Sequence, residues 1–62
     1  MYGDLCDKMI EAAVRRAEEL HPHYDGRRVA AMAVRYLESE IGRRLTGGEI
    51  QLVAEGAGQV WR

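Results

Sequence analysis

The sequence predicts an all-α fold, a small three-helix domain made of a helical hairpin and a shorter C-terminal helix. Three observations lead to this prediction. Apolar residues recur at spacings of three and four over two long segments, a proline separates those segments, and a helix-start signature precedes the last one. The chain has 62 residues, so we expect a single domain over residues 1–62.

The first predicted helix spans Asp4–Leu20. Asp4 is its expected N-cap, and the pair Glu11 and Arg15 has the favourable order for an i,i+4 contact. Pro22 cannot donate a backbone hydrogen bond, so the helix must end before it. The apolar residues fall on one half of this helix; they are Leu5, Cys6, Met9, Ile10, Ala13, Val14, Ala17 and Leu20.

The second predicted helix starts at Gly26 or Arg27 and runs to Leu45, with Asp25 as its N-cap. Its apolar positions cover more than half of the circumference, which one neighbouring helix cannot bury. We therefore expect it to pack on two elements, either two helices of its own chain or one of its own and one of a second copy. The apolar residues are Val29, Ala30, Met32, Ala33, Val34, Tyr36, Leu37, Ile41 and Leu45.

A third helix is predicted from Gly47. Thr46 and Glu49 have the S/T-x-x-E spacing of a capping box, and apolar residues recur at helical spacing after them. Gly56 and Gly58 oppose this interpretation, because each glycine weakens a helix interior by about 0.5–1 kcal/mol. The alternative is a hairpin that turns at these two glycines.

The length and composition favour a small protein that needs a partner. A chain of 62 residues buries only about 60% of the surface that its unfolded form exposes. Cys6 is the only cysteine, so no intrachain disulfide can form, and a reducing cytoplasm is the expected location. A homodimer through the broad face of the second helix would supply the missing burial.

The expected function is non-enzymatic: a protein–protein interaction or regulatory module that acts as a small homo-oligomer and binds another protein. Large apolar residues exceed what a three-helix core of this size needs, and exposed aromatic and methionine side chains are typical of protein contacts. The residues predicted to make this contact are Met32, Tyr36, Leu52 and Trp61.

A nucleic-acid-associated regulator is the first alternative. Phosphate groups would be contacted by two arginine pairs, Arg27 with Arg28 and Arg43 with Arg44. The net charge of −1 argues against this function, since small nucleic-acid-binding domains usually carry a marked positive excess.

A metal-binding protein is the second alternative. Cys6, His21 and His23 are ligand types suited to zinc, but no paired Cys-x-x-Cys or His-x-x-x-His motif reinforces them. No cofactor is expected, and neither Ser39 nor Thr46 lies in a catalytic signature. We expect Cys6 to be a small buried apolar residue and the histidines to be solvated turn residues.

Overall fold

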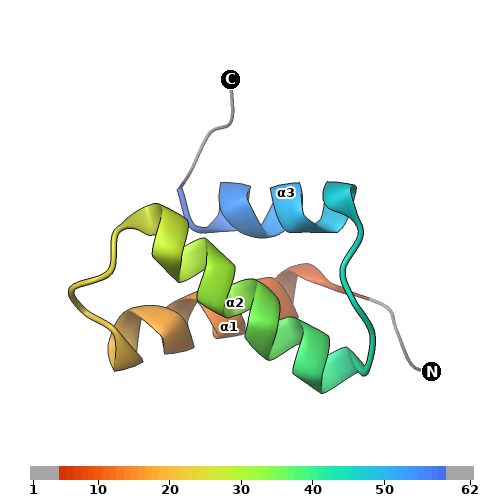
Figure 1. The fold of residues 1–62 in the computed structure, drawn as a ribbon, viewed down its shortest axis with the longest axis horizontal. Coiled ribbons are helices and arrows are strands. Elements are labelled where there is room, and N and C mark those ends of the chain that lie inside the picture. Colours follow the sequence, from red (N-terminus) through yellow and green to blue (C-terminus); the bar gives the residue numbers. More distant parts are fainter. Residues whose placement is uncertain (1–4, 59–62) are drawn as a thin grey trace.

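The computed structural model describes residues 5–58, and within them it contains three α-helices and no strand (Figure 1). The helices are α1 (Asp7–Leu20), α2 (Gly26–Ile41) and α3 (Gly47–Gly56). The predicted all-α fold, a helical hairpin followed by a shorter helix, is therefore confirmed.

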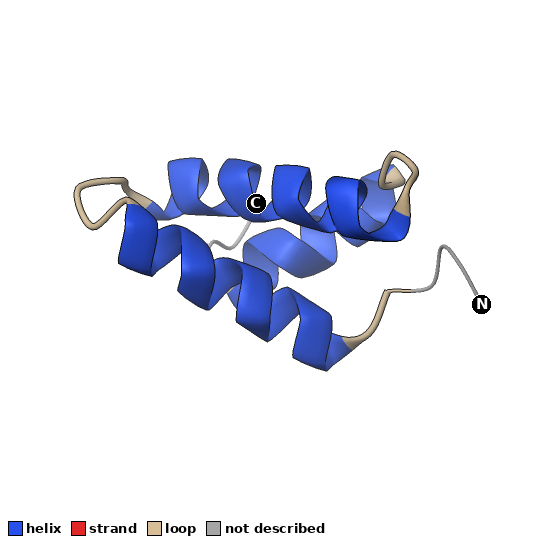
Figure 2. Ribbon diagram, turned by 90° about the horizontal axis from the view of Figure 1, so that it is seen from below, coloured by secondary structure: helices blue, strands red, loops and turns tan. Residues whose placement is uncertain are grey.

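Helix α2 is the central element of the fold and packs against both of its neighbours. α1 and α2 run antiparallel and diverge from the turn at residues 21–25, while α3 packs against both of them (Figure 2). The expectation that the second helix contacts two elements is met by α1 and α3 of the same chain.

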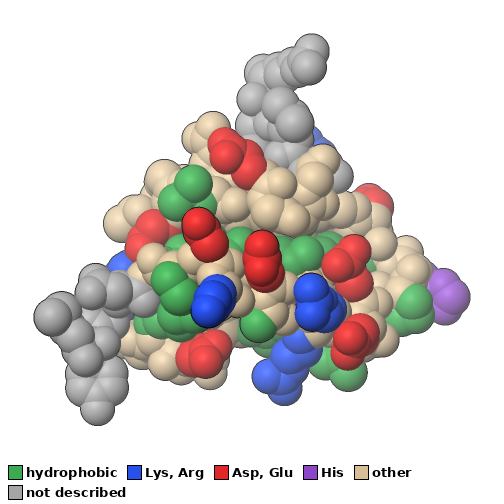
Figure 3. Space-filling model, turned by 180° about the vertical axis from the view of Figure 1, so that it is seen from behind, with side chains coloured by type: hydrophobic (Ala, Val, Ile, Leu, Met, Phe, Trp, Pro, Cys, Tyr) green, Lys and Arg blue, Asp and Glu red, His purple; other side chains and the backbone are tan. Residues whose placement is uncertain are grey.

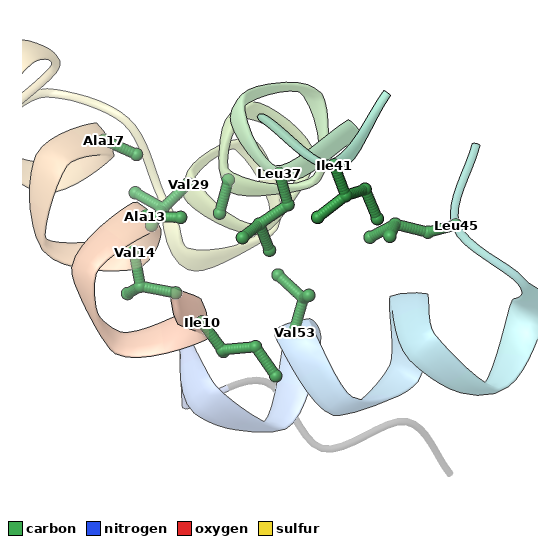
Figure 4. Close-up of a cluster of buried hydrophobic side chains, with 10 residues drawn as sticks. Ile10, Ala13, Val14, Ala17, Val29, Leu37, Ile41, Leu45 and Val53 are labelled. Atoms are coloured by element: carbon green, nitrogen blue, oxygen red, sulfur yellow. The ribbon is translucent and has the colours of Figure 1, made fainter. Parts of the chain in front are cut away.

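Small side chains form much of the core between the helices. Leu37 of α2 and Val53 of α3 are fully buried and point toward each other, and Ile10 of α1 lies next to them (Figure 4). The other buried apolar residues are Ala13, Val14, Ala17, Val29, Ala30, Ala33, Ile41, Leu45 and Ala54. Because five of these are alanines, the helices approach closely but bury few large side chains.

Side-chain caps fix the starts of α2 and α3 as the sequence predicts. The Asp25 carboxylate accepts a hydrogen bond from the Arg28 amide at 2.9 Å. The Thr46 hydroxyl accepts from the Glu49 amide, and the Glu49 carboxylate accepts from the Thr46 amide, which completes the capping box.

Two predicted helix ends are wrong. α1 begins at Asp7 and not at Asp4, because Cys6 has extended backbone angles and occupies the N-cap position; Asp4 itself lies outside the described residues. α2 ends at Ile41 and not at Leu45, because Gly42 adopts the left-handed conformation with φ of 74°. Leu45 is buried nonetheless, in the loop that follows.

The segment after Gly47 is a helix, so the alternative hairpin is wrong. Gly56 is the last residue of α3, where it permits a close approach to α1: a Cβ at this position would lie 2.9 Å from Cγ2 of Ile10. Gly58 has a positive φ of 81° in the turn that follows. The two glycines that argued against a helix therefore serve its packing and its end.

Two expectations about burial are also wrong. Cys6 is exposed, because it precedes α1 and does not share the apolar face of that helix. Leu20 is 57% exposed, because it is the last residue of α1 and no element of residues 5–58 covers that end of the hairpin.

Candidate interaction surface

An apolar groove runs between α2 and α3. Ala30 of α2 and Ala54 of α3 are buried at its floor, whereas Ala31 and Ile50 are exposed at its rims. Val34 is half-buried between them, and Arg27 is the charged residue that lines this groove. We call these six residues the α2–α3 groove.

The groove results from the short side chains that α2 and α3 present beside the core. Leu37 and Val53 fill the core between the two helices, whereas Ala30 and Ala54 at the floor of the groove are too short to fill the space above them. The side chain of Ile50 is 41% exposed in consequence. An apolar groove of this kind offers surface that a partner can remove from water.

A second hollow lies on the other side of α3, against α1. Leu52 is 52% exposed there and stands near Ile10 and Gly56. Carboxylates surround this hollow: Asp7, Glu11 and Glu55 all line it. Figure 3 shows acidic side chains on this face of the molecule, with Lys and Arg side chains among them. The lining of this hollow is acidic, whereas Arg27 is the charged residue of the α2–α3 groove, so the two flanks of α3 differ in charge.

The residues predicted to make the protein contact do not form one surface. Met32 is half-buried in a hollow with Tyr24, Arg28 and Arg35. Tyr36 is half-buried in another, between α1 and α2, and the Arg16 guanidinium lies 5.1 Å above its ring.

Leu52 lines the acidic hollow described above, apart from both of these residues. Trp61 lies outside the described residues. The three described residues therefore line three separate hollows.

The sequence prediction missed the α2–α3 groove. The sequence pattern places Ala30 and Val34 together on the apolar face of the second helix, but Ala30 is buried whereas Val34 is only half-buried. The available signal was the width of the apolar face of α2, which extends beyond the part that α1 and α3 cover.

The two arginine pairs lie at opposite ends of α2. Arg27 and Arg28 are in its first turn, and Arg43 and Arg44 follow its end, which separates the pairs by about 24 Å for a helix of 16 residues. Arg28 lies over the ring of Tyr24 at 5.5 Å. The four arginines do not gather into one basic patch.

Arg43 is bound within the chain. Its guanidinium donates to both carboxylate oxygens of Glu49 at 2.8 Å and also donates to the carbonyl of Arg44 at 3.0 Å. The hydrogen bonds from Arg43 and from the Thr46 amide lower the pKa of Glu49 from 4.5 to about 2. These contacts order the loop between α2 and α3 and place the start of α3.

The candidate metal ligands do not converge. Cys6 precedes α1 and His21 follows it, so the full helix of 14 residues, about 21 Å, separates them. The His21 ring stacks on Tyr24 with centroids 4.4 Å apart, while His23 is exposed. Over residues 5–58, no group of three or more His, Cys, Asp or Glu side chains is placed to hold a metal ion.

In the described part of the chain, no helix has the length and apolar character needed to cross a membrane. No protein-family model, curated protein or solved structure matches this chain. The candidate function therefore depends on the surface itself.

Proposed function

We propose that this protein is a non-enzymatic protein–protein interaction module that acts as a small homo-oligomer in the cytoplasm and binds another protein. The observation that supports this proposal is the α2–α3 groove, whose lining is apolar apart from Arg27. Exposed apolar surface at a groove between two helices is typical of a protein contact.

The small core supports the same proposal. Leu37 and Val53 are the largest side chains with less than 2% exposure, so the chain gains little from burial of large residues. Removing the side chains of Ile50 and Val34 from water in a complex would add the burial that a chain of 62 residues lacks. The exposed position of Cys6 fits a reducing compartment, where a thiol stays free.

The mass of the purified protein in solution tests the proposal. We expect light scattering coupled to size exclusion, at micromolar concentration, to give twice the chain mass of 7.0 kDa. Thermal unfolding should shift to higher temperature as the protein concentration rises, because association stabilises the folded state by mass action. A mass of 7.0 kDa over the whole micromolar range, with a melting temperature independent of concentration, would contradict self-association.

A further inference from the structure

We propose that the α2–α3 groove binds helix α2 of a second copy of this chain, antiparallel to its own α2, in a symmetric dimer. This inference rests on the proposed function and deepens it, since it names the occupant of the groove and the geometry of contact. It follows from the spacing and the charges of four residues on α2.

Four residues form a stripe along the groove side of α2. Arg27, Ala31, Val34 and Glu38 follow one another at spacings of four, three and four residues. At about 100° per residue they lie within about 60° of one another around the helix. This is the heptad spacing of residues that form the seam between two paired helices.

The stripe is complementary to itself when a second copy runs in the opposite direction. With a twofold axis between positions 32 and 33, Arg27 lies opposite Glu38 of the partner subunit, and Ala31 lies opposite Val34 of the partner subunit. The same two contacts occur again on the other side of the axis. Opposite charges therefore meet at both ends of the seam, and a small side chain faces a larger one at its centre.

The shape of the groove suits a helix at close range. Ala31 is exposed and short, and the neighbouring Ala30 and Ala54 are buried below it, so a second helix can approach closely. Ile50 stands at the rim, where it would flank the incoming helix from the α3 side. Its exposed apolar side chain would then be covered by the partner.

The acidic end of the stripe is held in place before any partner binds. Oε2 of Glu38 accepts a hydrogen bond from the Leu45 amide at 3.0 Å, and the Glu38 side chain is half-buried. This bond restricts the carboxylate at the end of α2 that lies away from Arg27. A carboxylate that is already ordered loses less conformational entropy when a guanidinium binds it.

The charges of the two surfaces favour the α2–α3 groove over the acidic hollow as the place where a second copy binds. The hollow between α1 and α3 is lined by Asp7, Glu11 and Glu55, so a symmetric contact there would bring carboxylates together. The α2 stripe has one positive and one negative end, which is what an antiparallel symmetric contact requires.

A substitution at the centre of the seam tests the inference first. Ala31→Glu should raise the dissociation constant of the dimer by about 30-fold or more, because it places a carboxylate against apolar surface at the centre of the contact. Ala31 is exposed, so the folded chain tolerates the change. The matched control is Ala12→Glu, the same change at an exposed alanine of α1; it should leave the dissociation constant within about twofold of wild type.

A charge exchange tests the antiparallel register. R27E and E38R should each weaken self-association by about tenfold at low salt, because each variant places like charges opposite one another at both ends of the seam. A one-to-one mixture of the two variants should form a mixed dimer within about threefold of the wild-type affinity. In that dimer, both pairs of opposing positions have opposite charges.

Recovery in the mixture would also show that E38R is folded, although this variant loses the hydrogen bond from the Leu45 amide. Circular dichroism checks the helix content of each variant, and E40R is the control for a reversed charge on another face of α2, because Glu40 is exposed and lies about 160° around the helix from Glu38. A parallel seam would place Arg27 and Glu38 each opposite its own counterpart, so the wild type would already oppose like charges and neither single variant would weaken the dimer. A contact through a different face would likewise be weakened by neither variant.

The outcomes separate this inference from the proposed function. If the wild type is a dimer, A31E dissociates it and the mixture of R27E and E38R forms a dimer, the results support both the inference and the proposed function. A wild-type dimer that neither A31E nor R27E weakens overturns the antiparallel contact and leaves self-association standing. A wild-type protein that stays monomeric throughout the micromolar range overturns the inference and the proposed self-association together.

Discussion

The two flanks of α3 differ in how closely α3 packs against the neighbouring helix and in the side chains that remain exposed there. Against α1, Gly56 brings the helix backbone close to Ile10, and the remaining hollow has an acidic rim. Against α2, alanines leave an apolar groove with Ile50 at its edge. A short or absent side chain can therefore either permit close packing of two helices or leave an exposed groove between them, depending on the side chains that the neighbouring helix presents.

The largest effect is expected for a substitution of Leu37. Leu37 is fully buried at the centre of the core, facing Val53 (Figure 4). Leu37→Ala should destabilise the fold by about 2–5 kcal/mol, because it removes buried methyl groups and leaves a cavity. Thermal denaturation followed by circular dichroism checks this, and an unchanged melting temperature would show that the core does not centre on Leu37.

A smaller effect is expected where α3 meets α1. Gly56→Ala should destabilise the fold by about 1–2 kcal/mol, because the new methyl group would stand 2.9 Å from Cγ2 of Ile10, so that the Ile10 side chain or one of the two helices must shift. The control is Gly48→Ala, at a position where a Cβ meets no atom within 4 Å. That variant should be neutral or slightly more stable than wild type.

A double-mutant cycle sharpens this prediction. In an Ile10→Ala background the steric conflict is gone, so Gly56→Ala should no longer destabilise and should gain the better helix propensity of alanine. Equal costs of Gly56→Ala in both backgrounds would mean that the close approach of α3 to α1 does not depend on this glycine.

The start of α3 sets the position of Ile50 in the groove, and its loss should have a moderate effect. Thr46→Ala removes the hydroxyl that accepts from the Glu49 amide at 3.3 Å. We expect a loss of about 1 kcal/mol in the free energy of unfolding, measured with urea. A cost below the error of the measurement would show that the Arg43–Glu49 pair alone fixes this helix start.

The smallest expected effect is a pH dependence from Glu49. Its pKa is lowered from 4.5 to about 2 in the folded protein, so the folded state binds this proton less readily than the unfolded state does. The stabilisation by the ionised carboxylate is therefore fully present above pH 4.5 and is lost as the pH falls toward 2.

Glu49→Gln isolates that contribution, because glutamine can still accept from the Thr46 amide but lacks the charge. Urea denaturation at a series of pH values should show that the difference between wild type and this variant shrinks over the same acidic window. A difference that stays constant through that window would contradict the role of the Arg43–Glu49 ion pair.

Local chemistry explains which parts of the fold the sequence could predict. Asp25, Thr46 and Glu49 make their hydrogen bonds to residues three positions away, so their spacing alone identifies the helix starts. Pro22 ends the first helix through its own backbone. The hydrophobic period likewise identifies the core residues, since Leu37 and Val53 lie on the expected faces.

The errors arose where a tertiary contact outweighs a local pattern. Leu45 continues the apolar spacing of α2 and is buried, yet Gly42 ends the helix before it and the Glu38 carboxylate holds the Leu45 amide instead. The α2–α3 groove depends on the distance between two helices, which no spacing within one helix encodes. Leu52, one of the predicted contact residues, is exposed, whereas Ile50, which is not among them, stands exposed at the groove rim.

The masses of the A31E variant and of the wild type, measured at the same micromolar concentration, test the proposed dimer through the α2–α3 groove most directly. We expect a dimer of twice 7.0 kDa for the wild type and for A12E, and a monomer of 7.0 kDa with unchanged helix content for A31E. A wild-type monomer, or an A31E dimer as stable as that of the wild type, would contradict the account.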